Sequence, residues 1–386
     1  QELLDAYDSV ETTLGVAELD ERTGRHNGHH LLDGWKSYAA GSTDPLDTKA
    51  PAVWFSKNWR SDAPENKCIS CGYCNTGCPY GRKNAMPESY LTQATGHGAK
   101  ILADTTVSRI IWTDVSRSHA RGVEVSVKGG AKRTIMATKG VVVAAGTVAS
   151  TNVLRESGIE KSGEGISLNI ACPVVALMPN EVRSWDEDQM STYIDRADFL
   201  IESHFQPPLS MATLVPGWFD DHFDRMLNYN RLASAGVLFP ADRLGRVKKG
   251  KLHFELTEAE LDVLRRGLAT MTKVHFANGA LEVYPALLVG QTLKRGMTDE
   301  EIDRFYEESI REPDDIVLSS SHPQGGNAIN ADPAKGVIDP DNRVHGTDNV
   351  YVCDASVFPS CIRVNAQLTT MAMSHRATHG KRIFGG

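Results

Sequence analysis

The pattern of apolar and polar positions along this chain predicts a mixture of helices and strands. Two helices are clearly marked, because each begins with a capping box, in which a threonine and a glutamate three residues later satisfy each other's backbone groups. The first box is Thr257 and Glu260. An apolar stripe follows it at Leu261, Leu264, Leu268 and Met271. The second box is Thr298 and Glu301, and the helix after it should stop before Pro313.

Three further stretches have helical spacing: 88–94, 147–157 and 366–383. Strands are predicted elsewhere. Four short apolar runs separated by turn residues are typical of a β-meander, at 100–103, 107–112, 122–127 and 133–137. The run 141–145 is uniformly apolar and ends at Gly146, as a strand buried on both faces would. Alternating runs punctuated by proline and glycine fill 168–256 and predict an antiparallel sheet.

One familiar element is missing from this pattern. A dinucleotide-binding unit consists of a strand, a Gly-x-Gly-x-x-Gly turn and a helix. Gly72, Gly77 and Gly81 have the wrong spacing for that turn, and Gly325 with Gly326 lies too near the C-terminus. The sequence therefore predicts no such unit in this chain.

Composition and charge limit the kinds of partner that this chain could bind. The 386 residues are 41% hydrophobic and 23% charged, as in ordinary globular proteins. The formal charge of −8 argues against a nucleic-acid or anionic-membrane partner. The densest basic run, Lys248, Lys249 and Lys251, surrounds Gly250 and is typical of a solvated hairpin turn. No apolar stretch approaches the roughly 18 residues of a transmembrane helix.

Seven cysteines are present, and four of them fall in one loop. Cys68, Cys71, Cys74 and Cys78 form the run C-x2-C-x2-C-x3-C-P. This distribution does not suggest a disulfide framework and favours a reducing compartment, so we expect a cytoplasmic location. The spacing is that of bacterial ferredoxins and predicts an iron–sulfur cluster, 4Fe-4S or 3Fe-4S. A metal-free loop, a zinc site and a strained disulfide are the alternatives.

The strongest candidates for catalytic residues lie near the C-terminus. His322 stands in Ser-Ser-His-Pro-Gln-Gly-Gly, a short strand ends at Asp354, and Asn365 opens a helix. Taken singly, His322 could be a turn histidine and Asn365 an N-cap. The ordered stretch from one to the other resembles the C-terminal signature of the glucose–methanol–choline (GMC) flavoprotein oxidoreductases. The resemblance covers most of residues 60–386.

This resemblance implies FAD as cofactor and an alcohol as substrate. His322 would take the hydroxyl proton, since its unperturbed pKa lies near neutrality, and Asn365 would hold the substrate oxygen. The positive end of the last helix, at Asn365 and Ala366, would stabilise charge on the reduced flavin. The remaining implied cofactor contacts are Val107, Ala145, Gly146, Asp354 and Ala355.

The resemblance also implies the organisation of the chain, a GMC-like fold of the α+β or α/β class. We expect a helical and irregular segment at 1–66 and, at 67–167, the cysteine loop with part of an FAD-binding domain. Residues 168–314 should form a substrate domain built on an antiparallel sheet, and 315–386 a C-terminal FAD-binding and catalytic segment. In this family the Gly-x-Gly-x-x-Gly unit is N-terminal, so we expect a second polypeptide, or a portion outside this sequence, to supply it.

The leading functional hypothesis is an FAD-dependent dehydrogenase that oxidises a CH–OH group of a sugar, sterol or long-chain alcohol. Its electrons would pass to the cluster and then to an acceptor protein or quinone. The loop also resembles that of the catalytic subunit of bacterial FAD-dependent glucose dehydrogenases, which binds a cluster, and that of long-chain alcohol oxidases, which need not carry metal. The first alternative is therefore an oxygen-dependent alcohol oxidase with a metal-free cysteine loop. The second is a non-catalytic iron–sulfur electron-transfer subunit.

Overall fold

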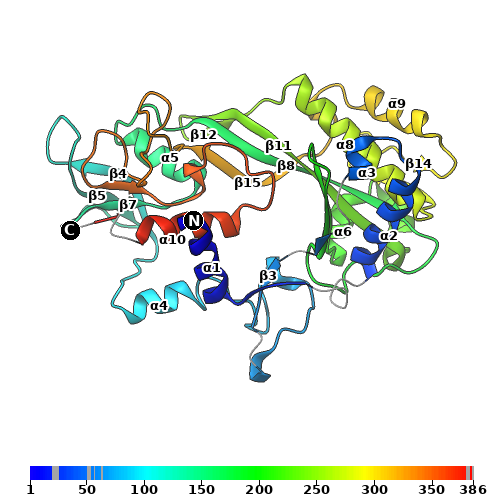
Figure 1. Cartoon of the computed structure of the whole chain (residues 1–386), viewed down its shortest axis with the longest axis horizontal. Coiled ribbons are helices and arrows are strands. Elements are labelled where there is room, and N and C mark those ends of the chain that lie inside the picture. The colour runs from blue at the N-terminus through cyan, green and yellow to red at the C-terminus, as the bar shows by residue number, and fades with distance from the viewer. Residues whose placement is uncertain (20–25, 50–53, 56, 62–63, 380–382, 385–386) are drawn as a thin grey trace.

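The computed structural model describes residues 1–19, 26–49, 54–55, 57–61, 64–379 and 383–384. Two lobes are joined by the long strands β8 (Glu164–Leu177) and β11 (Leu232–Lys248), as Figure 1 shows. These strands pair in antiparallel register along most of their length. They belong to a sheet of nine strands among the described residues, and every pairing in that sheet is antiparallel.

The nine-stranded sheet gathers strands from distant parts of the chain. In spatial order its path is β14 (Leu293–Lys294), β13 (Glu282–Pro285), β8, β11, β10 (Leu200–Ser203), β9 (Thr192–Asp195) and β2 (Trp54–Phe55). Two strands lie off this path: β12 (Lys251–His253) pairs with β11, and β15 (Ser319–Gly326) pairs with β8. The expected antiparallel sheet of an α+β fold is confirmed.

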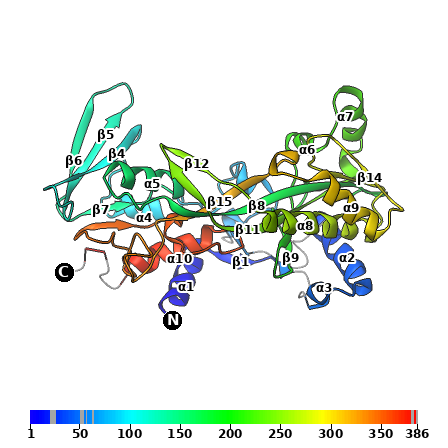
Figure 2. The same cartoon turned by 90° about the horizontal axis from the view of Figure 1, so that it is seen from above.

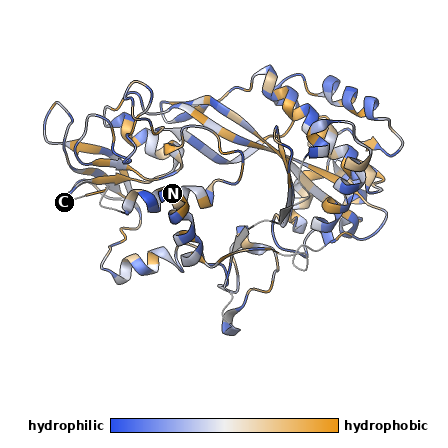
Figure 3. Ribbon diagram, viewed as in Figure 1, coloured by the Kyte–Doolittle hydropathy of each residue, from blue (hydrophilic) through white to orange (hydrophobic). Residues whose placement is uncertain are grey.

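One face of this sheet is covered by helices and forms the main core. The strands alternate, so Val174 and Val237 point into the core while their neighbours point to the other face. Helices α8 (Glu258–Ala277), α2 (His26–Gly41) and α9 (Asp299–Ser309) pack against this core. Figure 3 shows hydrophobic residues concentrated on the long strands and hydrophilic ones on the outer helix α9. Both predicted capping boxes are present, at the starts of α8 and α9.

The opposite face of the sheet carries the short helices α6 (Pro208–Leu214) and α7 (Phe219–Met226), which project from the molecule in Figure 2. Trp218, Phe219 and Phe223 at α7 are 84%, 89% and 61% exposed. These three side chains therefore belong neither to the core of the sheet nor to the lining of the cavity described below. Phe205, which follows β10, is buried.

The second lobe combines two small sheets with helices. β4 (Thr105–Trp112), β5 (Ala120–Val127) and β6 (Lys132–Met136) form the predicted meander, and β7 (Val141–Val143) pairs in parallel with β16 (Val350–Val352). Around them lie α5 (Thr147–Glu156), the short turn η5 (Ala355–Val357) and α10 (Gln367–Thr378). α1 (Glu2–Leu14) packs on α10, so the first and last helices of the chain lie side by side.

The remaining elements are all short. They are β1 (Val16–Glu18), which pairs with β3 (Lys57–Trp59), α3 (Pro45–Lys49), α4 (Tyr90–Gly96) and the short turns η1 (Pro64–Asn66), η2 (Tyr73–Asn75), η3 (Tyr229–Arg231) and η4 (Pro313–Asp315). Among the described residues, no helix has both the length and the apolar character needed to cross a bilayer.

Three local predictions were wrong. Residues 100–103 form no strand, and Ile101 and Leu102 are exposed, because an apolar run alone does not provide a pairing partner. The run 141–145 yields only the three-residue β7, and Val142 is 40% exposed, so this strand is not buried on both faces. The last helix ends at Thr378, and residues 380–382 of the predicted helix lie outside the described residues.

Candidate active site

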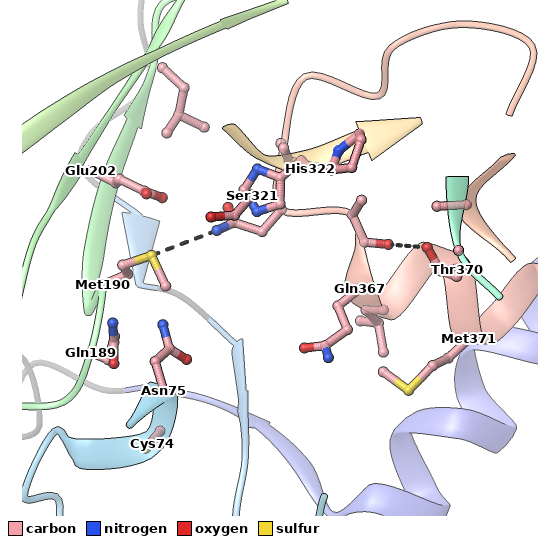
Figure 4. A pocket seen from close by; sticks show the side chains of 18 of the residues that line it. Cys74, Asn75, Gln189, Met190, Glu202, Ser321, His322, Gln367, Thr370 and Met371 are labelled. Carbon is pink, nitrogen blue, oxygen red and sulfur yellow. Dashed lines mark hydrogen bonds between the residues drawn. The ribbon is translucent and has the colours of Figure 1, made fainter. Parts of the chain in front are cut away.

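A cavity of about 830 Å³ lies where the two lobes meet. Strands β9, β10 and β15, the N-terminal ends of α5 and α10, and the cysteine loop all contribute to its walls. In Figure 4, Gln189, Met190 and Glu202 stand on one side and Gln367, Thr370 and Met371 on the other. Its volume lies within the range of small-molecule sites in proteins.

His322 projects into this cavity from β15. The backbone position of His322 is opposite Asn169 of β8, so pairing with the long strand fixes where the imidazole lies. The Nδ1 atom of the ring is buried and has no hydrogen-bond partner among the described residues. Burial lowers the pKa of His322 from its usual 6.5, and the charge of Glu202 partly opposes this effect. A neutral imidazole in a cavity wall can accept a proton from a ligand.

Asn365 reaches the same cavity from the segment before α10. Ala366 occupies the N-cap position of that helix, and no side-chain cap hydrogen bond is present. Asn365 is therefore not an N-cap in this structure. Its amide Nδ2 instead points across the cavity toward the sulfur of Met190, 3.7 Å away. The sequence-predicted pair His322 and Asn365 thus lines one cavity, although the two residues lie on different elements.

The wall formed by α5 and α10 fits the expected flavin. Gly146, Ala355 and Ala366, three of the predicted cofactor residues, line it. Gly146 precedes α5 with a φ of 83°, and no atom lies within 4 Å of the point where a Cβ would stand, so its backbone faces open space. The N-terminal ends of both helices carry partial positive charge, which suits an electron-rich ring or a phosphate. With the unpartnered His322 nitrogen, these features fit FAD.

Three predicted cofactor residues, Asp354, Ala145 and Val107, do not line this cavity. Asp354 is buried behind the wall and ties its parts together, accepting hydrogen bonds from the Gly146 and Ser356 backbones at 2.9 and 2.8 Å and from the Ser150 hydroxyl. Ala145 is exposed beside Gly146 and is not part of the lining. Val107 lies on β4, 40% exposed, and lines neither cavity described here.

The cysteine loop forms a second, much smaller cavity beside the first. All four predicted ligands, Cys68, Cys71, Cys74 and Cys78, line it. Cys74 and Lys83 also line the main cavity, so the two spaces share a wall. Gly72 lets the loop approach the sheet, because a Cβ there would come within 2.3 Å of the Phe205 ring.

In its described arrangement this loop does not form a metal site. None of the four cysteines forms a disulfide, and no group of three or more His, Cys, Asp or Glu side chains in the described chain is placed to hold a metal ion. The volume between them is about 10 Å³, room for about one water molecule. Backbone amides do point at two sulfurs, from Ser70 to Cys68 at 3.4 Å and from Arg82 to Cys78 at 3.3 Å.

Two polar residues near His322 were missed by sequence reasoning. Glu202 lines the cavity from β10 and is only 6% exposed. Asn169, opposite His322, is fully buried, and both polar atoms of its amide lack a partner among the described residues. Each had a signal, since a carboxylate inside Phe-Leu-Ile-Glu-Ser and an amide inside Ile-Ser-Leu-Asn-Ile interrupt runs that otherwise predict buried strands.

Comparison with protein families gives two matches. The N-terminal and C-terminal family models of the GMC oxidoreductases match residues 51–175 and 241–374. An uncharacterized GMC-type oxidoreductase of Mycobacterium tuberculosis is 27% identical, over 95% of this chain and 56% of its own length. A long-chain-alcohol oxidase of Arabidopsis thaliana is 24% identical, over 79% of this chain and 45% of its own length. The chain spans about half the length of these curated relatives.

Solved structures show the same fold. Pyridoxine 4-oxidase from Mesorbium loti superposes with a TM-score of 0.63 at 15% identity, over 94% of this chain and 70% of that one. At this identity the similarity supports the fold and says nothing about the substrate.

Proposed function

Because this chain belongs to the GMC oxidoreductase family, we propose that it forms the catalytic and substrate-binding part of an FAD-dependent enzyme that oxidises an alcohol to a carbonyl compound. The family implies FAD, which when bound accepts a hydride from the carbinol carbon. The observation that supports this proposal best is the shared cavity of His322 and Asn365, bounded by two helix N-termini.

The residues of this chain would then have separate roles in the reaction. Neutral His322 accepts the proton of the substrate hydroxyl, and the Asn365 amide donates a hydrogen bond to the substrate oxygen. The ends of α5 and α10 and the open backbone at Gly146 hold the cofactor. The apolar side chains of Met190, Leu200 and Met371 exclude water from the cavity.

The decisive variant is His322→Ala. Removing a general base costs about 10²- to 10⁴-fold in rate, so we expect anaerobic flavin reduction by substrate, followed by stopped-flow absorbance, to slow by that factor. His253→Ala is the matched control, since that histidine is exposed on β12 and lies outside the cavity lining. Wild-type flavin reduction in the folded His322→Ala protein would contradict the catalytic role and favour an electron-transfer subunit.

The same base predicts a pH dependence. His322 must be neutral to accept a proton, and burial lowers its pKa below 6.5. The rate of flavin reduction should therefore be constant at neutral pH and fall on acidification, with an apparent pKa below 6.5. An apparent pKa well above 6.5 would mean that another group acts as the base.

The iron–sulfur cluster remains a proposal that rests on the spacing of Cys68, Cys71, Cys74 and Cys78. Its further support is that the four cysteines line one space, which shares a wall with the main cavity. The described thiols do not form a ligand set, so they would have to turn inward on cluster binding.

An oxygen-dependent oxidase is the second candidate, and the names of relatives favour it. The Arabidopsis relative is called a long-chain-alcohol oxidase. Anaerobically purified protein separates the two forms. A broad absorption band with bound iron and sulfide, both lost in Cys74→Ser, supports the cluster. Hydrogen peroxide formed in proportion to substrate under air, without iron, supports the oxidase.

We also propose that a unit outside this sequence binds the ADP half of FAD. The support is the absence of a Gly-x-Gly-x-x-Gly turn from this sequence and the parallel pair β7 and β16, which finds no third strand among the described residues. Such pairs normally belong to larger, covered sheets. Flavin retention should require co-expression with that unit, and tight FAD binding by this chain alone would contradict the proposal.

A further inference from the structure

The cavity has a polar group that the proposed reaction does not use. Glu202 lies in the middle of β10, whose four residues are all buried. Ile201 points into the core, whereas Leu200 and Glu202 face the cavity. Burying a carboxylate costs free energy unless it is paired or serves a ligand. A carboxylate in this position therefore requires an explanation.

A specific arrangement holds this carboxylate in place. His204 Nε2 lies 3.4 Å from the Oε1 atom of Glu202. The residue opposite Glu202 on β11 is Gly236, and a Cβ there would stand 2.2 Å from Cε1 of His204. The missing side chain thus makes room for the imidazole. Since His204 is not part of the cavity lining, it supports Glu202 from behind.

The other side of the carboxylate faces the cavity. Within the described part of the chain, only His204 pairs with Glu202, which leaves acceptor capacity directed at a ligand. No direct bond to His322 is present among those residues, although both line the same space and Figure 4 shows them on adjoining walls.

The two long walls of the cavity differ in electrostatic character. The α5 and α10 wall ends in helix N-termini and suits the cofactor. The β9 and β10 wall carries Glu202 among the largely apolar side chains of Met190, Tyr193 and Leu200. If the flavin ring binds at the α5 and α10 wall, Glu202 lies on the side of the cavity left for the substrate.

We propose that Glu202, positioned by His204, is a second polar subsite that accepts a hydrogen bond from a hydroxyl or ammonium group of the substrate other than the group being oxidised. The substrate is then a diol, polyol or amino alcohol with an apolar spacer, rather than a simple alkanol. This inference deepens the proposed function and relies on it only for which group reacts.

Equilibrium binding tests the subsite without catalysis. Met86, Met190 and Met371 line the cavity, so ¹³C-methyl methionine NMR of the FAD-loaded holoprotein reports its occupancy. The probes are an α,ω-alkanediol, the corresponding amino alcohol and the plain alkanol of equal chain length, added under anaerobic conditions to His322→Ala, in which we expect oxidation to be slow. We expect the two donor-bearing probes to bind about 10- to 100-fold more tightly than the alkanol, as for a hydrogen bond to a charged group.

Two substitutions separate charge from hydrogen bonding. Glu202→Gln should weaken the amino alcohol most, and Glu202→Leu should weaken both donor-bearing probes to the level of the alkanol. Glu187→Gln is the matched control, because Glu187 is also a buried glutamate but accepts from the Gly28 backbone, outside the cavity lining. If the Glu202 variants do not fold, His204→Gln and the ranking of probes in the unsubstituted subsite decide the question.

Kinetics give the second readout. In otherwise wild-type enzyme, the ratio of kcat/KM for donor-bearing substrate to that for alkanol should fall at least tenfold in Glu202→Leu. Equal losses for both substrates, or equal binding of all three probes, would overturn the subsite. Failure of the His322 test with the ranking of probes intact would overturn the proposed reaction and leave the subsite standing.

Discussion

The wall that carries Glu202 and the wall that carries Gly146 are built in different ways. The first belongs to a sheet with strands as long as 17 residues, covered on one face by α2, α8 and α9. The second rests on two parallel strands of three residues each, where Val142 is 40% exposed. Parallel strands are usually covered on both faces. The difference indicates that the substrate side is built on the larger core, whereas the cofactor side has a smaller core of its own and a short parallel pair that is partly exposed among the described residues.

The largest expected effect on stability comes from removing a buried group of ion pairs on the substrate side. Arg196, between β9 and β10, is 4% exposed and pairs with Asp44, Asp47 and Asp198. Arg196→Ala leaves Asp47, which is 1% exposed, without its cation, so the free energy of unfolding should fall by about 3–5 kcal/mol in urea denaturation. The control Arg266→Ala removes a half-exposed partner of Asp198 and should cost less than about 1 kcal/mol. Equal losses would mean that the buried pairing adds little.

The next largest effect is on the pH dependence of stability, and it arises from a pair of buried histidines on the substrate side. His30 and His275 join α2 to α8 through a 3.0 Å contact, and burial lowers the pKa of His30 to about 4. Burial, with the charge of His30, also lowers the pKa of His275. Both rings stay neutral when folded but protonate below about 6.5 when unfolded, so the free energy of unfolding should fall as the pH drops from 6.5 toward 4. The loss from His30 is on the order of 3 kcal/mol.

Chemical denaturation at pH 7 and pH 4 measures this loss. His30→Gln should reduce the acid slope, while His253→Gln, at an exposed site, should leave it unchanged. An unaltered slope in His30→Gln would assign the acid sensitivity to other groups.

The smallest expected effect comes from making the same change, valine to alanine, on each of the two sides. Val174 on β8 is fully buried in the core, so Val174→Ala should cost roughly 2–3 kcal/mol. Val142 on β7 is partly exposed in this chain, and Val142→Ala should stay within about 0.5 kcal/mol. If a further unit covers β7, the cost at Val142 should rise toward that at Val174 when the unit is present. Similar costs in this chain alone would contradict the comparison.

Local chemistry made part of the fold predictable. The boxes Thr257/Glu260 and Thr298/Glu301 start helices as expected, because capping involves residues within one turn. The hairpin at Gly250 joins β11 and β12 for a similar reason, since a tight turn needs a residue that tolerates positive φ. Residues 100–103 failed because their apolar character says nothing about a pairing partner.

The same distinction between local and long-range determinants applies to the candidate site. The sequence by itself determined the motif around His322 and Asn365, the cysteine spacing and the lack of a dinucleotide turn, all of which are properties of near neighbours. Only the tertiary structure decided that Glu202 shares a cavity with His322, 120 positions away, through β10, β11, β8 and β15. It also decided that Val107 lies apart from that cavity. Strand pairing over such separations depends on which buried faces fit together, and no local pattern of residues encodes that choice.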